Sequence, residues 1–296
     1  HDYFRCWRQP FLIGIAGNSG VGKTSLAKKL EDIIGKNSVS HLKGDSYHIW
    51  DRNKPIWNTL THLNPRANEL EKLNNDLSML ISEKKIHTSS YDHTTGKKFF
   101  NNFIVNNNFI IAEGLHIFIF NELRNKCGVR IFLDIEEKLR RKFKIDRDVD
   151  TRGYDRKKVL FNLDRRKDDE KKYIESQKKF SDLIITVRST KNFDYNQNGN
   201  RLVVEIVSKE PSYYETISKL ILTHSNLGVE TDYTKENKMI INGIISKFSI
   251  TKIYKAYIKK DNELMDIDYL WDEGPRGLIQ LICIIEIFNS LKKRIN

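Results

Sequence analysis

Phe11–Ile34 reads FLIGIAGNSGVGKTSLAKKLEDII and is the stretch that decides the fold. Its first six residues, Phe11–Ala16, are apolar and uncharged, as in a strand buried on both faces of a parallel sheet. The next eight, GNSGVGKT, satisfy the pattern G-x-x-x-x-G-K-[ST], and Ser25–Ile34 has the apolar spacing of an amphipathic helix. A strand, a glycine-rich loop and a helix start therefore follow one another in the order that phosphate binding requires.

This loop predicts a nucleoside triphosphate site. Glycines let successive backbone N–H groups point inward, and the start of the helix adds a partial positive charge. Lys23 can reach the β- and γ-phosphates, and Thr24 can ligate a magnesium ion. The residues expected to bind the nucleotide here are Gly17, Asn18, Ser19, Gly20, Val21, Gly22, Lys23, Thr24 and Ser25.

The composition is that of a globular protein with an anionic ligand. The chain has 296 residues, 39% of them hydrophobic, and a formal net charge of +12. Residues 138–180 hold 17 Lys and Arg against 9 Asp and Glu, so this segment carries much of the excess. A localised basic segment after a phosphate-binding loop indicates a phosphate clamp, with a solvated helix face as the alternative. The sequence contains neither a helix-turn-helix pattern nor the combination of aromatic and basic residues that would indicate nucleic acid binding.

Cysteine usage and hydropathy indicate a cytoplasmic protein. Cys6, Cys127 and Cys283 are scattered and follow neither a metal nor a disulfide spacing, which is typical of a reducing compartment. No run of about 18 apolar residues is present, so we expect no membrane span and no membrane partner.

Strands and helices alternate through the first two thirds of the chain. The expected strands are Ser38–Lys43, Asn108–Ala112, Val129–Ile135 and Asp182–Val187, and the expected helices are Ala67–Lys85, Glu136–Arg147 and Lys157–Lys179. Ile86–Val105 is expected to form a hairpin turning around Thr94–Gly96. This order predicts an α/β fold, a three-layer α/β/α sandwich with a mostly parallel central sheet.

Beyond Arg188 the pattern changes. We expect a strand at Leu202–Val207, a helix at Tyr213–Thr223, an antiparallel pair formed by Met239–Ile245 and Ser249–Lys259, and an apolar helix at Gly277–Leu291. We therefore expect a core over residues 1–200 that contains the phosphate-binding loop and a basic helical lid at about 140–180, and a C-terminal extension over 201–296 packed on that core. The wide apolar stripe of the last helix is compatible with core packing or with a homodimer.

Three carboxylates are candidates for the chemistry. Asp45 follows an expected strand, and ligands of open parallel sheets bind beyond the carboxyl ends of strands, so Asp45 can act as a base toward an acceptor hydroxyl. Glu113 ends an apolar strand, the usual position of a carboxylate associated with magnesium. Asp148 lies between Arg147 and Arg152, which would keep it ionised. A turn residue at 45 and an ordinary ion pair at 148 are the alternatives.

Seven ordered segments carry a resemblance to a known family. They are GNSGVGKT, GDSYHIWDR, HLNPRANEL, YDHTTGK, IIAEGLH, KIDRDVDTRG and RRKDDEKKYIESQKKFSDLII, spread over 11–187. Together they resemble the phosphoribulokinase/uridine kinase family of P-loop kinases. The segments YDHTTG and EGLH and the RD…RG pattern are more similar to the phosphoribulokinase branch.

The resemblance implies ATP and Mg²⁺ as cofactors and assigns roles to further residues. Asp45 would be the base, with Lys23 and Asp148 supporting catalysis, and Thr24 and Glu113 would lie at the metal. Arg147 and Arg166 would close over the ATP phosphates together with Lys144. The residues implied to contact the acceptor are His48, Arg52, His62, Tyr91, His93, Lys144 and Arg152.

The leading hypothesis is a kinase that transfers the γ-phosphoryl group of ATP to a hydroxyl of a sugar phosphate or related polyol. A uridine/cytidine kinase with the same fold is the first alternative. A nucleic-acid-associated NTPase that uses the +12 charge, and an ATP-binding module without transfer activity, are the remaining ones.

Overall fold

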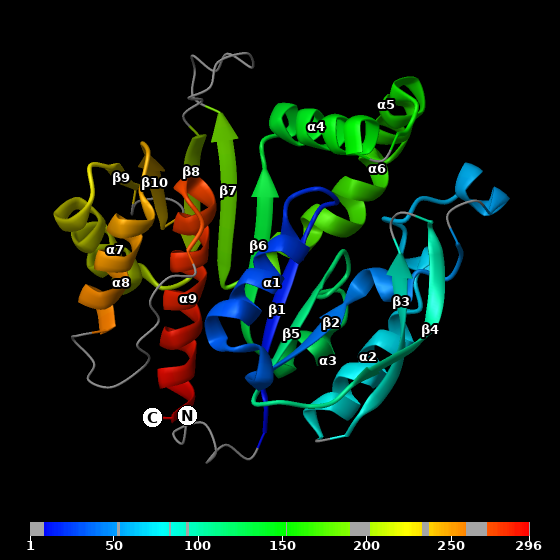
Figure 1. Ribbon diagram of the computed structural model, residues 1–296, viewed down its shortest axis with the longest axis horizontal. Coiled ribbons are helices and arrows are strands. Elements are labelled where there is room, and N and C mark those ends of the chain that lie inside the picture. The colour runs from blue at the N-terminus through cyan, green and yellow to red at the C-terminus, as the bar shows by residue number, and fades with distance from the viewer. Residues whose placement is uncertain are drawn as a thin grey trace. The chain divides into compact units, whose positions relative to one another are not determined.

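The computed structural model describes residues 9–51, 54–82, 84–92, 95–151, 153–189, 202–232, 237–258 and 271–295 (Figure 1). The chain divides into two compact units. The first comprises His1–Leu133 and Arg140–Ser181, and the second comprises Asp134–Leu139 and Asp182–Asn296. The expected division into a core and an extension at residue 200 stays a prediction.

The first unit contains four parallel strands in the order β2-β5-β1-β6. Their bounds are Phe11–Gly17 for β1, Val39–Lys43 for β2, Phe109–Gly114 for β5 and Cys127–Ile135 for β6, whose last two residues belong to the second unit. Every residue of β1 and β5 is buried, as the apolar runs predict. Because these strands are parallel, their carboxyl ends meet at one edge, and the polar residues that follow them gather there.

The helices of the first unit begin with α1 (Lys23–Ile34), which packs on β2 and β5. The others are α2 (Leu70–Ile81), α3 (Asn121–Lys126), α4 (Glu137–Asp146, begun in the second unit), α5 (Arg156–Arg165) and α6 (Lys167–Asp169). The predicted helix over Lys157–Lys179 is helical but changes its winding, because a π turn (Glu170–Ile174) and a 3₁₀ turn (Glu175–Phe180) follow α6.

A separate two-stranded sheet consists of β3 (Ile86–Asp92) and β4 (Lys97–Ile104). The two strands are antiparallel, with Asp92 opposite Lys97, and Gly96 has a φ of 71° at the turn between them. Positive φ is accessible to glycine at little cost, so this turn can close tightly. The predicted hairpin is confirmed.

The described residues of the second unit form four antiparallel strands in the order β7-β8-β10-β9. Their bounds are Leu183–Ser189 for β7, Leu202–Ser208 for β8, Gly228–Asp232 for β9 and Lys238–Asn242 for β10. The helices are α7 (Pro211–His224), α8 (Lys247–Ile258) and α9 (Gly274–Ile295), and α9 contacts α8 and β8. The predicted α/β class, with a mostly parallel sheet and antiparallel C-terminal additions, is confirmed.

One predicted element of the second unit is wrong. Ser249–Lys259 was expected to pair with the preceding strand, but residues 247–258 form α8, and the partner of β10 is β9. The buried residues of α8 are Ile250, Ile253, Tyr254 and Tyr257, which recur at intervals of three and four. This spacing places them on one helical face, and it outweighs the β-propensity of isoleucine and tyrosine.

None of the helices in the described part of the chain combines the length and apolar character that a membrane-spanning segment needs. Of the three cysteines, Cys127 and Cys283 lie in the described part of the chain, where Cys127 donates from Sγ to the backbone oxygen of Leu123, and Cys6 lies outside it.

Candidate functional site

The phosphate-binding loop connects β1 to α1 and depends on its glycines. Gly17, Gly20 and Gly22 have φ values of 149°, 90° and 93°, a region that residues with a side chain rarely adopt. A Cβ atom on Gly17 would also lie 2.3 Å from the backbone oxygen of Leu133. Gly22 caps α1, so the helix begins at Lys23, two residues earlier than predicted. The loop therefore has the backbone conformation of an anion-binding nest.

The two polar side chains after the loop meet the carboxylate at the end of β5. Lys23 is buried and donates from Nζ to the backbone oxygen of Asn18 at 2.9 Å, and Thr24 Oγ1 donates to Glu113 Oε1 at 2.9 Å. Burial lowers the pKa of Lys23, and the charges of Glu113 and Asp45 oppose that shift. Burial also raises the pKa of Glu113, with Lys23 acting against it. The site thus holds a buried cation and a buried carboxylate side by side.

Asp45 lies in a 3₁₀ turn, Gly44–Tyr47, directly after β2. A Cβ atom on Gly44 would lie 2.9 Å from Gly114 Cα, so the two glycines let the ends of β2 and β5 approach closely. The turn is anchored to α2, because the hydroxyl of Tyr47 donates a hydrogen bond to Asp76 Oδ2 at 2.7 Å. Asp45 is thereby fixed close enough to Lys23 and Glu113 for its charge to influence the pKa of both groups.

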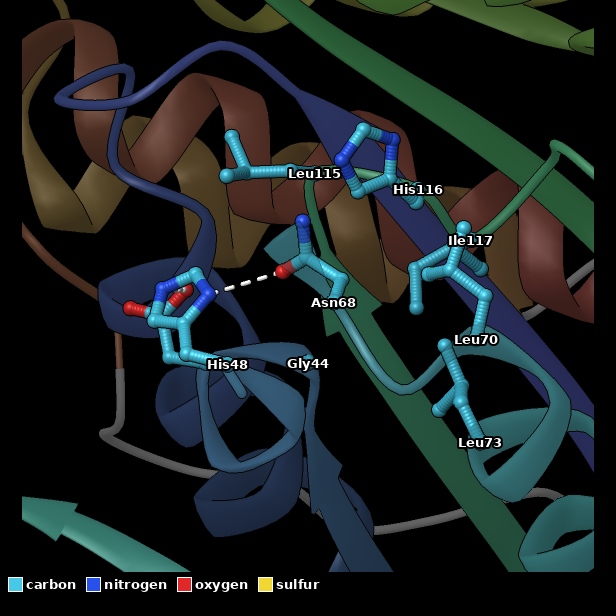
Figure 2. A pocket seen from close by; sticks show the side chains of 9 residues that line it. Gly44, His48, Asn68, Leu70, Leu73, Leu115, His116 and Ile117 are labelled. Atoms are coloured by element: carbon cyan, nitrogen blue, oxygen red, sulfur yellow. Dashed lines mark hydrogen bonds and ion pairs between the residues drawn. The ribbon is translucent and has the colours of Figure 1, made fainter. Parts of the chain in front are cut away.

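Asp45 also lines a small pocket of about 10 Å³, enough for one water molecule (Figure 2). The other lining residues are Gly44, His48, Asn68, Leu70, Leu73, Leu115, His116 and Ile117. His48 Nε2 lies 3.6 Å from Asp45 Oδ1, and His48 Nδ1 lies 2.7 Å from Asn68 Oδ1. His116 is 3% exposed, neither of its ring nitrogens has a hydrogen-bond partner among the described residues, and burial lowers its pKa to about 4. The pocket therefore has polar groups on one side and an apolar floor on the other.

Aromatic rings continue from His48 away from this pocket. The ring of His62 lies 4.7 Å from that of His48 and 3.7 Å from that of Trp57, and the ring of Tyr91 lies 5.6 Å from that of His48. Trp50 packs edge to face on Trp57 at 5.7 Å. Burial, followed by the charge of His48, lowers the pKa of His62 to about 2, so His62 is neutral. The structure thus brings His62 and Tyr91 together with His48.

The basic segment contributes a second group of charges. Lys144 of α4 is buried. A Cβ atom added to Gly20 would lie 3.8 Å from Lys144 Cβ, so the side chain of Lys144 lies against the phosphate-binding loop. Arg147 donates from Nε to Asp148 Oδ1 at 2.9 Å. Burial lowers the pKa of both Lys144 and Arg166. The charge of Arg166 lowers the pKa of Lys144 further, and other arginines of the segment act on both groups in the same direction. The charge of Asp148 opposes these shifts. Buried cations whose charged forms are disfavoured in this way provide a site for an anion.

The loop that contains residues 57–61 is joined to the basic segment by three hydrogen bonds. Arg165 of α5 donates to the backbone oxygens of Asn58, at 3.0 Å, and of Trp57. Thr61 Oγ1 donates to Asp169 Oδ2 of α6 at 2.7 Å. These hydrogen bonds connect residues more than 100 positions apart in the sequence.

Three predicted site residues, Arg52, His93 and Arg152, lie outside the described residues. The other predicted residues fall into two neighbouring groups, one at the phosphate-binding loop and one around Asp45 and His48. Sequence reasoning assigned no role to Asn68 or His116, although both lie in the motifs HLNPRANEL and EGLH. It also missed the buried ion pair of Arg140 and Glu170, whose Nη2 and Oε2 atoms are 2.8 Å apart.

Comparison with known proteins gives a consistent result. A sequence model described as the phosphoribulokinase/uridine kinase family matches residues 12–194. A phosphoribulokinase of Synechocystis sp. is 32% identical over 199 residues, which cover 67% of this chain and 60% of the relative. A uridine kinase of Deinococcus deserti is 28% identical over 182 residues, which cover 60% of this chain and 87% of the relative.

The chain thus spans about three fifths of the length of the phosphoribulokinase that it matches. Among solved structures, a phosphoribulokinase from Rhodobacter spheroides has the same fold, with a TM-score of 0.61 at 17% identity. That similarity covers 96% of this chain and 99% of the solved chain, so it includes the antiparallel C-terminal part.

Proposed function

The chain belongs to the phosphoribulokinase/uridine kinase family, and on this basis we propose that it transfers the γ-phosphoryl group of ATP to a hydroxyl of a sugar phosphate or related polyol. Ribulose 5-phosphate, which the name of the phosphoribulokinase relatives indicates, is the first acceptor to examine. The observation that supports this most is the position of Asp45. Its carboxylate lines a pocket on one side and acts electrostatically on the P-loop lysine on the other.

In this proposal Asp45 acts as the general base. The acceptor hydroxyl donates its proton to an oxygen of Asp45 as its own oxygen attacks the γ-phosphorus atom, and the bond between that phosphorus and the bridging oxygen of ADP breaks. His48 lies beside the base and contacts the same acceptor. The pocket has room for no more than one water molecule, so few water molecules can compete with the acceptor hydroxyl on this side.

The positive groups of the site stabilise charge on the transferring phosphoryl group. Lys23 approaches it from the P-loop, and Lys144, Arg147 and Arg166 approach it from the basic segment. Burial disfavours the charged forms of Lys23, Lys144 and Arg166, and a bound polyphosphate would supply the negative charge that offsets this cost. Preorganised cations of this kind act more strongly than they would in water.

Magnesium fits the donors at the same edge of the sheet. Thr24 and Glu113 supply hard oxygen ligands, and a divalent cation would oppose the effect of burial on the pKa of Glu113 and favour its ionised form. When bound, Mg²⁺ neutralises charge on the β- and γ-phosphates and favours departure of ADP.

A screen of ATP consumption tests the proposal. The purified chain is incubated with Mg-ATP and, in turn, with ribulose 5-phosphate, other pentose phosphates, sugar alcohols and nucleosides, and release of ADP is measured. We expect turnover with at least one phosphorylated sugar. Protein that binds ATP and yet phosphorylates none of these compounds would refute the proposal.

A nucleoside acceptor is the second candidate, and the aromatic cluster favours it. Trp57 and His62 stack with an angle of 31° between their rings, and they lie next to His48. A pyrimidine base can be held by such rings. Turnover of uridine or cytidine without turnover of phosphorylated sugars would select this function instead.

A further inference from the structure

Asn68 lies where two segments of the acceptor side are joined. It follows a 3₁₀ turn (Pro65–Ala67), precedes α2, and forms an isolated antiparallel bridge with His48. Backbone hydrogen bonds lie on both sides of this bridge, from Ile49 N to the oxygen of Ala67 at 3.0 Å and from Glu69 N to the oxygen of Tyr47 at 2.7 Å. The backbones that carry the two side chains are therefore held in register.

The orientation of the Asn68 amide is determined by its surroundings. Nδ2 donates to the backbone oxygens of His62, at 3.1 Å, and of Asn64, at 2.9 Å, so both protons of the amide nitrogen are used. A flipped amide would direct Oδ1 at two carbonyl oxygens, which is repulsive. Oδ1 must therefore face His48 Nδ1, which lies 2.7 Å away (Figure 2).

This orientation decides where His48 carries its proton. An amide oxygen only accepts hydrogen bonds, so Nδ1 of His48 must be the donor. In the neutral ring the lone pair is then on Nε2, the nitrogen that lies 3.6 Å from Asp45 Oδ1. The distance is too long for a direct hydrogen bond between the two, and it leaves two acceptor atoms side by side.

We infer that Asn68 is a positioning residue that holds the proton of His48 on Nδ1, so that Nε2 and Asp45 together accept hydrogen bonds from hydroxyls of the acceptor. The part of this inference that concerns catalysis rests on the proposed function, whereas the tautomer does not. Asn68 contacts no reacting atom in this scheme and acts only through His48. A substrate with two neighbouring hydroxyl groups could donate one hydrogen bond to His48 Nε2 and the other to the carboxylate of Asp45.

Nuclear magnetic resonance of the full chain tests the tautomer directly. The chain has eight histidines, and ¹⁵N-labelled imidazole spectra distinguish a neutral ring protonated on Nδ1 from one protonated on Nε2. The spectra are recorded at a pH above which the shifts no longer change, and His48→Asn identifies the signal of His48. We expect the Nδ1–H tautomer in the unaltered protein. An Nε2–H tautomer would overturn the inference without any variant and without substrate.

Two substitutions separate positioning from folding. Asn68→Leu has nearly the same size but accepts no hydrogen bond, and we expect the His48 signal to move toward the Nε2–H tautomer. Asn64→Ala is the matched control, because it alters the same loop and keeps the backbone oxygen that Asn68 uses.

Kinetics provide the second readout. We expect Asn68→Leu to raise the KM of the acceptor about tenfold, with the KM of ATP nearly unchanged, because one hydrogen bond to the acceptor is lost. An unchanged tautomer in Asn68→Leu would overturn the inference. Absence of turnover by the unaltered protein would instead refute the proposed function, so the two failures are distinguishable.

Discussion

Replacing Asp45 by asparagine removes one carboxylate and leaves the shape of the site unchanged. The side chain of Asp45 is 34% exposed and lies in a turn that Tyr47 anchors through Asp76, so we expect no loss of folded structure. The same substitution removes the only proposed base. General base catalysis contributes roughly 10²- to 10⁴-fold to a rate, so turnover should fall by that factor.

Asp45→Asn should leave the affinity for Mg-ATP unchanged or increase it, although it reduces turnover. The charge of Asp45 raises the pKa of Glu113 and of Lys23, and its loss removes a negative charge from the neighbourhood of the phosphates. The Kd of Mg-ATP should therefore stay within about fivefold of its original value or decrease.

The assay measures ADP release at saturating ATP together with ATP binding by calorimetry. Asp51→Asn is the matched control, because Oδ1 of this second carboxylate accepts from Lys98 N at 3.1 Å, and an asparagine keeps that acceptor. We expect the control to retain turnover within about twofold. A reduction of less than about tenfold in Asp45→Asn would refute the assignment of Asp45 as the base.

Three further predictions follow from burial and charge. Lys144→Met should reduce kcat by about 10²- to 10³-fold without lowering the free energy of unfolding, since it removes a desolvated cation; retained activity would exclude Lys144 from phosphate binding. His116 is neutral when folded, with a pKa of about 4 against 6.5, so its ring binds more protons in the unfolded chain within that window, and the contribution of His116 to stability should fall by up to about 3 kcal/mol as the pH decreases from 6.5 to 4. Urea unfolding at both ends of this range should show a smaller loss in His116→Gln, and an equal loss would contradict the pKa. Gly44→Ala should destabilise the fold by about 1–3 kcal/mol, because its Cβ would lie 2.9 Å from Gly114 Cα, and unchanged urea unfolding would mean that the strands can separate there at no cost.

The phosphate-binding half of the site was predictable because its signal is local. The loop residues and the helix after them are consecutive in the sequence, and the motif itself fixes the glycines at 17 and 22, both of which have positive φ. Glu113 and Asp45 were predictable from a more general rule, since each follows or ends a buried strand of a parallel sheet.

The remaining features depend on contacts that the sequence does not display. Asn68 and His48 are 20 positions apart, and only the folded chain shows that one fixes the proton of the other. The burial of Lys144 and Arg166, on which their depressed pKa values depend, could not be inferred from a segment that is charged throughout. In α8, isoleucine and tyrosine favoured a strand by composition, and helical spacing of the buried residues decided otherwise.

The hydrogen bonds between the loop that contains residues 57–61 and the basic segment have a thermodynamic consequence. Arg165 and Thr61 join the loop that carries Trp57 to the helices that follow Lys144, so neither part can be displaced alone without breaking these hydrogen bonds. A ligand that stabilises one arrangement of the loop would therefore also stabilise the matching arrangement of the basic segment. By linkage the effect is reciprocal, so under the proposed function ATP would increase the affinity for the acceptor by the same factor by which the acceptor increases the affinity for ATP.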